Sequence, residues 1–518
     1  MPLQVALSMA CVTAISAFLV GFFHFLDRLC KTHNWTRKAR RGLPPGPHGW
    51  PVLGNMLVMC GEAVHGRLQE LGKRFQGMFT LRLDFKHLFV ICRKVIMLTS
   101  YQRFREFLVD HAWEFAGRPP ELHFDGVPVK GNVFLSIICL QCIVAAGMDE
   151  DARAIRKFTL VTLRSFGFGK TSMQDTMLLE TTNLLDALRQ HTGRPLNPRT
   201  PIANASANVI AGVLLGKTFP HGTDGFRDLM DSLLQGVEVM TIKEQNLYLP
   251  FLKPFLKKKY QQHLGRFLYG IGILADTVKE HVGIRVSGLP RDFIDCWLQH
   301  AEQSAKGPFD QQHLTSVVFD MFTGGFETTC STILWVMSMM LHHPDIQLRM
   351  QKEIDNVVRA DERVTLEHRD QLVYTEAVIL ETMRKYPLLP FSVPHASTMD
   401  TSVAGYHIPE GTRVMVHVYS IHHDPALWTD PATFRPERFI TANQTLTVPE
   451  FFIPFGAGRR SCIGEQLARK ELFLFIANIL HTFRIRLPEA AALPSLQGSA
   501  GVVFYPPPFE VVLEERSG

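Results

Sequence analysis

The sequence predicts a mainly α-helical fold with a smaller β-rich part, preceded by one N-terminal transmembrane helix. Three observations lead to this prediction: helical periodicity fills most of the chain, short strand-like runs gather in two places, and an apolar stretch opens the sequence. Hydrophobic residues make up 46% and charged residues 20% of the 518 residues. A chain of this composition can bury a large core and is not expected to be disordered.

The opening segment, residues 3–26, is almost wholly apolar, and His24 is its only residue that could carry charge. It is long enough to span a bilayer as a helix. Basic residues follow it and none precedes it, so the positive-inside rule places the N-terminus outside and the rest of the chain in the cytosol. A cleaved signal peptide is the alternative, although it would need a basic stretch before the apolar one. We therefore predict a membrane anchor at 3–26, a basic and Pro-rich linker at 27–52, and one folded unit at 53–518.

The elements of the folded unit follow from local patterns. Strand-like runs lie at 77–83 and 88–91, and a further group lies between 403 and 419. The longest helical pattern runs from 310 to 343, and because two acidic residues interrupt its apolar middle, we predict a buried central helix rather than a second membrane span. Another helix, with one apolar face, is predicted from 463 to 483.

Charge and cysteine content limit the classes of function. The net charge of +5 is too small to indicate nucleic-acid binding, but it fits a protein with one cationic face for anionic lipid or for an acidic partner. The nine cysteines are odd in number and show no regular spacing. They indicate free thiols in a reducing compartment rather than a disulfide framework.

The most specific segment runs from Phe455 to Gly464 and reads FxxGxRxCxG, directly before the second predicted helix. Cys462 would lie at a helix N-terminus, where free N–H groups and the helix dipole favour a thiolate. Gly458 would let the backbone approach closely, and Arg460 could pair with an acidic group on a cofactor. A buried structural cysteine in a glycine-rich turn is the alternative, and the full set of fixed positions favours a thiolate metal site.

This segment resembles the haem-binding signature of the cytochrome P450 superfamily. The similarity covers nearly the whole chain after the anchor and is closest to the microsomal family-2 type, as in segments 290–295, 434–439 and 464–469. The resemblance implies the P450 fold, haem b with Cys462 as the axial ligand of its iron, and insertion of one oxygen atom into a lipophilic substrate. It also implies an NADPH-dependent flavoprotein reductase as electron donor, cytochrome b5 as a further partner, and the endoplasmic reticulum membrane as location.

The resemblance gives several other residues a role. Glu327 and Thr328 match an acid and a hydroxyl that manage protons during oxygen activation. An ordinary helix with Thr328 bonded to its own backbone is the alternative. Glu381 and Arg384 of an ExxR motif would form a structural triad with Arg438, with further acceptors expected among backbone carbonyls near the cysteine loop. The residues expected to contact the cofactor are Cys462, Arg460, Phe455, Gly458, His395, Arg156 and Arg118.

One region departs from the family pattern. The family's third helix usually supplies a Trp and, four residues later, an Arg, whereas this chain has Ala152 and Arg156. The preceding run, 133–147, is also longer and more apolar than the family pattern. Either the run is a real insertion that repacks the site, or the stretch from about 134 to 151 is an error in the coding sequence. The second explanation would make the chain a haem-poor, non-catalytic product.

The substrate site is only weakly encoded. The resemblance would line it with the loop after Arg118, with Phe322 and Phe326, and with the segments 391–393 and 502–503. Such a pocket is apolar and implies a lipophilic substrate, without choosing among fatty acids, steroids and foreign compounds. A haem-thiolate isomerase or dehydratase that needs no external electrons is the rival enzyme class, and the intact acid–hydroxyl pair argues against it.

Overall fold

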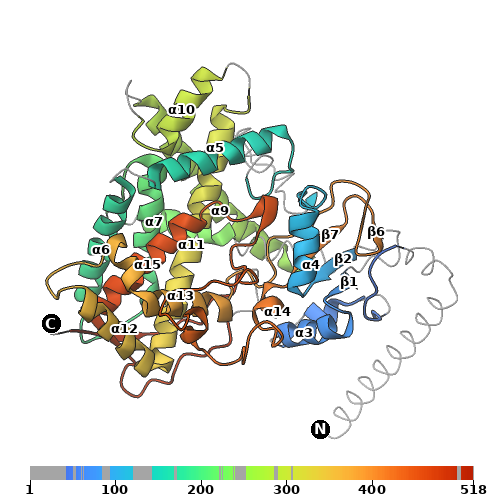
Figure 1. Ribbon diagram of the computed structural model, residues 1–518. Coiled ribbons are helices and arrows are strands. Elements are labelled where there is room, and N and C mark those ends of the chain that lie inside the picture. The colour runs from blue at the N-terminus through green and yellow to red at the C-terminus, as the bar shows by residue number, and fades with distance from the viewer. Residues whose placement is uncertain are drawn as a thin grey trace, which may run out of the picture.

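We describe the fold from a computed structural model of the chain (Figure 1). The residues that it describes are 42–50, 54–59, 61, 63–83, 94–120, 143–167, 172–220, 223, 226–236, 239, 253–284, 290–304, 307–498 and 503–516. The predicted membrane anchor (3–26), most of the linker (27–52) and much of the apolar run at 133–147 lie outside these residues. Within them, no helix combines the length and the hydropathy that a membrane crossing requires.

Helices form most of the described chain. The α-helices are α3 (Val64–Arg74), α4 (Tyr101–Arg105), α5 (Glu150–Gly167), α6 (Ser172–Arg189), α7 (Arg199–Leu215), α9 (Lys253–Gly283), α10 (Phe293–Gln303), α11 (Gln311–His342), α12 (Pro344–Val357), α13 (Val373–Lys385), α14 (Val418–His422) and α15 (Glu465–Thr482). Short turns of other helix types are η1 (Met56–Met59), η2 (Glu106–Asp110), η5 (Leu366–Gln371), η6 (Pro436–Phe439) and η7 (Gly458–Arg460).

The strands form three small sheets. They are β1 (Met78–Arg82), β2 (Lys94–Leu98), β3 (Pro195–Leu196), β4 (His395–Ala396), β5 (Thr401–Val403), β6 (Tyr406–Ile408), β7 (Arg413–Val416), β8 (Phe483–Arg486) and β9 (Val511–Glu515). The largest sheet has the order β1-β2-β7-β4, in which β2 and β7 are parallel and the other pairs antiparallel. In Figure 1, β1, β2 and β7 lie beside α3 and α4, on the side of the molecule opposite α6 and α12.

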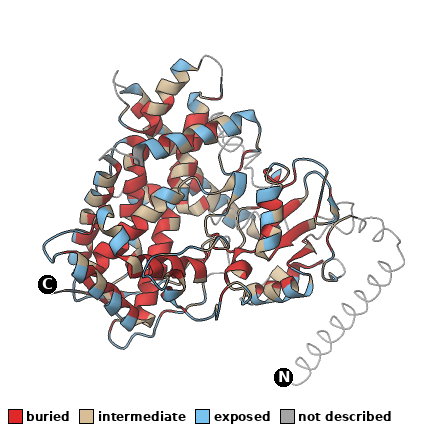
Figure 2. Cartoon of the chain, in the orientation of Figure 1, coloured by how far each residue is buried: buried red, intermediate tan, exposed pale blue. Residues whose placement is uncertain are grey.

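Helix α11 is the centre of the helical part, as the sequence predicts. Asp310 caps it by accepting a hydrogen bond from the backbone N–H of His313 at 2.8 Å, and Pro344 begins the next helix. Helices α7, α9, α13 and α15 pack against it. Most of its side chains are buried (Figure 2), so it is a core helix of a globular unit.

Some predicted elements differ from the structure. The strand predicted at 77–83 is confirmed as β1, whereas 88–91 lies outside the described residues and β2, at 94–98, was not predicted. Helix α15 begins two residues later than predicted. The prediction that it has one apolar face was wrong, because every residue from Glu471 to Leu480 is buried. Helices pack around it on several sides, so its polar Glu471 and Asn478 are buried together with its apolar residues.

Candidate functional site

The cysteine loop is built as a tight turn before α15. The backbone N–H of Cys462 donates to the carbonyl of Phe455 at 2.9 Å, which closes the loop. Gly458 has a φ of +73°, and a β-carbon there would collide with the carbonyl oxygen of Leu108 in η2. Only glycine allows this conformation and this approach, so the motif glycine fixes the loop against η2.

The side chain of Cys462 lies just before α15, which begins at Glu465, and it is exposed to solvent. Desolvation by the protein packed around it nevertheless raises the pKa of its thiol. Backbone N–H groups of Gly464 and Glu465 donate to the sulfur and oppose this shift. The helix N-terminus is therefore present as predicted, but it does not by itself produce a thiolate. A bound metal cation would have to replace the proton.

Two of the predicted cofactor-binding cations meet at one short segment. His395 contacts the carbonyl of Phe115 through Nδ1 at 2.9 Å, and Arg460 donates through Nε to the carbonyl of Ala116 at 2.8 Å. Burial holds the pKa of His395 well below its usual value, and the charges of nearby arginines act in the same direction. His395 is therefore a neutral ring near pH 7, suited to hydrogen bonding rather than to charge neutralisation.

Arg118 joins this group. Its Nη1 donates to the carbonyls of Val393 and Pro394, at 3.2 and 2.7 Å, so it lies against the chain immediately before His395. The positive charges of Arg118 and Arg460 both act on His395. The structure thus brings Arg118, His395 and Arg460 together, as the resemblance implied.

Arg156 reaches the same loop from α5. It donates to the backbone carbonyl of Ser461, the residue before Cys462. Burial lowers the pKa of its guanidinium, while the facing Cys462 acts in the opposite direction. Ala152, one turn earlier, is half-buried, and its backbone N–H donates a hydrogen bond to Asp149 Oδ1 at 2.8 Å. Three arginines and the neutral His395 therefore lie around the cysteine loop.

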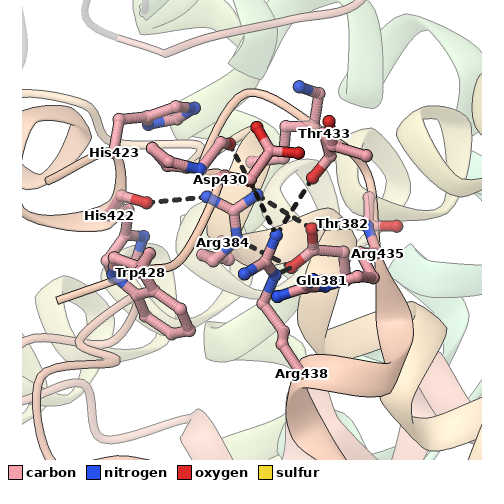
Figure 3. A network of polar contacts seen from close by, with 12 residues as sticks. Glu381, Thr382, Arg384, His422, His423, Trp428, Asp430, Thr433, Arg435 and Arg438 are labelled. Carbon is pink, nitrogen blue, oxygen red and sulfur yellow. Dashed lines mark hydrogen bonds and ion pairs between the residues drawn. The ribbon is translucent and has the colours of Figure 1, made fainter. Parts of the chain in front are cut away.

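The predicted structural triad forms as three buried, charged side chains (Figure 3). Arg384 donates to both carboxylate oxygens of Glu381, at 2.7 and 2.8 Å, and Arg438 Nε lies 3.0 Å from the same carboxylate. The side chains of Glu381 and Arg384 are 0% exposed and that of Arg438 is 5% exposed. The indole of Trp428 packs within 5.4 Å of the Arg384 guanidinium.

The remaining donors of the two arginines bind backbone carbonyls, but not near the cysteine loop as predicted. The acceptors lie at the last residue of α14 and in the segment that connects α14 to η6, as Figure 3 shows for several of them. Arg384 donates to His422 and Pro431, and Arg438 donates to Thr429, Asp430 and Thr433. The triad therefore fastens α13 to the 422–438 segment rather than to the loop of Cys462.

The acid and the hydroxyl of α11 point to different partners. Thr328 donates to the carbonyl of Gly324 at 2.7 Å, which is the helix-internal bond considered as the alternative. Glu327 is buried and accepts from Ser331 at 3.2 Å and from Arg199 Nη2 at 2.8 Å. Helix α11 is continuous through Gly324 and Gly325. Within the described residues, no hydrogen bond joins the two side chains directly.

Arg199 was missed by sequence reasoning. It is the first residue of α7 and lies 128 positions before Glu327 in the chain. The only signal in the sequence was that an acid inside an apolar helix needs a partner. Nothing in the pattern indicated which of the many basic residues supplies it.

The residues expected to line a substrate pocket are only partly placed. Phe322 and Phe326 are 0% and 1% exposed and belong to a hydrophobic cluster shared with α7, α9 and α10. Phe391 stacks against His65 and His417. The loop after Arg118 lies mostly outside the described residues. A surface cavity of about 570 Å³ lies near α14, and none of these predicted residues lines it.

A second group of potential metal ligands occurs away from the cysteine loop. His281, Asp292 and Asp295 are buried, with His281 Nε2 at 3.1 Å from Asp292 and 3.6 Å from Asp295. Arg291 donates to both carboxylate oxygens of Asp295. Because the group contains its own counter-charges, it functions as an ion-pair cluster that joins α9 to α10.

The residues around Cys462 fit a haem group. An exposed cysteine sulfur is a soft ligand for iron, and three arginines nearby match the two carboxylates of a haem. His395 adds a neutral hydrogen-bonding ring. The turn at Gly458, where a β-carbon would collide with Leu108, holds the loop against η2. The chemistry of the donor set therefore agrees with the cofactor.

Comparisons with known proteins agree with this site. The family described as Cytochrome P450 matches residues 44–513. Cytochrome P450 2D4 of Rattus norvegicus is 33% identical over 97% of this chain and 98% of its own length. Cytochrome P450 2F3 of Capra hircus is 32% identical over 95% of this chain and 98% of its own length. Human cytochrome P450 2U1 is 31% identical over 93% of this chain and 91% of its own length.

The chain therefore belongs to the cytochrome P450 family. It is a P450 monooxygenase, a haem-dependent oxidoreductase. The relatives named above are microsomal members of P450 family 2.

Proposed function

We propose that this chain inserts one atom of dioxygen into a lipophilic substrate, with haem b bound through Cys462. When bound, the haem supplies dioxygen activation, which a thiolate ligand promotes by donating electron density. The observation that carries the proposal is the convergence of Arg118, His395, Arg156 and Arg460 around the Cys462 loop. In this proposal Phe455 and Gly458 shape the loop, the three arginines pair with the propionates, and the neutral His395 adds a hydrogen bond.

Proton management is assigned to α11. Thr328 lies half-buried on the helix, and its hydroxyl can rotate away from the Gly324 carbonyl to donate elsewhere. Glu327 is buried one residue earlier, and burial raises the pKa of its carboxyl while Arg199 and Ser331 lower it. Because burial raises the pKa of this carboxyl, it binds a proton more readily than an exposed glutamate does, which suits a group that handles protons.

Electrons are proposed to come from an NADPH-dependent flavoprotein reductase, with cytochrome b5 as a second partner. Five basic residues could form a docking face for this partner: Lys157 and Arg459 are exposed, and Arg156, Arg469 and Lys470 are half-buried. Arg459 lies 3.7 Å from the ring centre of Trp113, next to the cysteine loop. An exposed cationic face close to the cofactor site is suited to an acidic partner.

We also propose that residues 3–26 anchor the chain in the endoplasmic reticulum membrane, with the catalytic unit in the cytosol. The apolar length of this segment and the basic residues after it support the proposal. The microsomal relatives point to the same membrane.

The test is to reconstitute the full chain with a flavoprotein reductase in phospholipid vesicles. Fatty acids, steroids and lipophilic foreign compounds are supplied under ¹⁸O₂, with and without NADPH. We expect product that requires NADPH and carries one labelled oxygen atom. Unlabelled product formed without NADPH would instead identify a haem-thiolate isomerase or dehydratase.

A further inference from the structure

An exposed indole lies at the junction between α5 and the cysteine loop. Trp113 lies three residues after η2 and is 42% exposed. The guanidinium of Arg459, in η7 of the loop, lies over its ring at 3.7 Å from the ring centre. The guanidinium of Arg153, in α5, lies over the same ring at 5.3 Å. Both distances are within the range of a cation–π interaction, so one ring contacts a cation from each element of the junction.

The backbone that carries this ring is fixed on the side of the cysteine loop. The carbonyl of Trp113 accepts a hydrogen bond from the Thr398 hydroxyl at 3.2 Å, and the carbonyl of Glu114 accepts one from the Thr398 N–H at 2.7 Å. Just before this turn, η2 packs against η7, where the carbonyl oxygen of Leu108 lies against Gly458. The ring is therefore held in place by the same part of the fold as the cysteine loop.

Helix α5 reaches this part of the fold through two arginines. Its neighbours along most of its length are α6 and α10. Arg156 donates to the carbonyl of Ser461, and Arg153, three positions earlier on the same helical face, contacts the ring of Trp113. Glu150 lies 3.8 Å from Arg153, but its side chain is 92% exposed, so this ion pair contributes little. The contact with the indole is therefore the one that reinforces the contact of Arg156 with the loop.

Positive charge gathers at this junction. Arg153 and Arg459 approach one ring, and Arg156 and Arg460 belong to the same two elements. Like charges repel, and this repulsion acts to separate α5 from the loop. The face of an indole attracts guanidinium groups without carrying a net charge. It therefore offsets the repulsion, whereas a carboxylate in its place would compete with the carboxylates of a cofactor for the same cations.

We propose that Trp113 is a positioning residue for the cofactor site. Through Arg153 and Arg459 its ring holds the first turn of α5 against the cysteine loop. The junction then keeps Arg156 and Arg460 in the places from which they pair with the cofactor carboxylates. The inference rests on the proposed binding of haem at this loop, and it adds a residue that acts through the arginines.

The first measurement is the rate at which the full-length holoprotein loses haem to an excess of a haem-scavenging globin, followed by absorbance. Trp113→Leu keeps an apolar side chain but removes the π face, and it should speed haem loss about three- to tenfold. Trp113→Phe keeps an aromatic face and should stay close to the wild type. Tyr269→Ala, at an exposed aromatic residue of α9, should leave the rate unchanged.

The second measurement is backbone hydrogen exchange in the same variants, which locates the change along the chain. We expect faster exchange in residues 150–157 and 458–464 of Trp113→Leu, with exchange in α13 unchanged. Arg153→Met should affect the same two segments. It should add nothing to Trp113→Leu in the double variant, because both substitutions break the same contact.

Equal rates of haem loss in Trp113→Leu and the wild type overturn the proposal. An additive loss in the double variant overturns it as well. So does exchange that rises equally in α13, because a general loss of stability would then explain the result. Neither measurement depends on turnover, so failure of the monooxygenase assignment would appear separately, as absent NADPH-dependent product from the wild-type chain.

Discussion

Glu381→Gln tests the claim that the buried triad holds the fold together. The carboxylate is the counter-charge of two guanidiniums that are almost fully buried, and glutamine keeps its size while removing its charge. Removing one partner of a buried ion pair costs about 3–5 kcal/mol, because the remaining charge stays buried without compensation. Carbonyl acceptors from the 422–433 segment remain, so the donors of Arg384 and Arg438 stay partly satisfied.

The matched control is Glu437→Gln in the neighbouring η6. Glu437 pairs with Arg349, and their side chains are 46% and 50% exposed. Exposed pairs of this kind contribute about 0–1 kcal/mol. Urea unfolding followed by circular dichroism compares the variants, and midpoints are used because a large cofactor protein need not unfold in two states. A midpoint for Glu381→Gln no lower than that of Glu437→Gln would refute the reasoning.

Three further predictions follow from the same structure. Thr328→Ala should still consume NADPH, but hydrogen peroxide should replace the oxygenated product. Unchanged product per NADPH consumed would mean that Thr328 only bonds its own helix backbone and does not handle protons. Burial raises the pKa of Glu471 from 4.5 to about 8, so the folded state binds more protons than the unfolded state between these values and stability falls as pH rises through this range. Glu471→Gln should therefore be more stable than the wild type at about pH 8 and equal to it at about pH 4, and equal urea midpoints at both would contradict the burial argument. Ala152→Trp, with a family-like segment before it, should raise haem occupancy, and equal occupancy would make the unusual run a genuine feature of this chain.

Local sequence patterns predicted the central helix and the cysteine loop, and the family resemblance singled out the ExxR pair. Each of these predictions depends on spacing within a few turns, such as the offset of three positions from Glu381 to Arg384, or on Pro344, which follows α11. Strand β2 was missed because four of its five residues are buried, so it reads as a continuous apolar run without alternation.

Contacts between distant segments could not be read in this way. The pairing of Arg199 with Glu327 spans 128 residues. The carbonyls that accept hydrogen bonds from Arg384 and Arg438 lie at the end of α14 and in the connection that follows it. The sequence showed that buried charges need partners, but tertiary packing decides which partners they meet.

The absorbance spectrum of the reduced protein with carbon monoxide tests the central claim most directly, since it reports the axial ligand of the haem iron. The wild-type chain should show the thiolate signature, and Cys462→Ser should lose it while Cys330→Ser, at a buried cysteine in α11, retains it. A wild-type protein that binds haem without the thiolate signature, or a Cys462→Ser variant that keeps it, would contradict the assignment of Cys462.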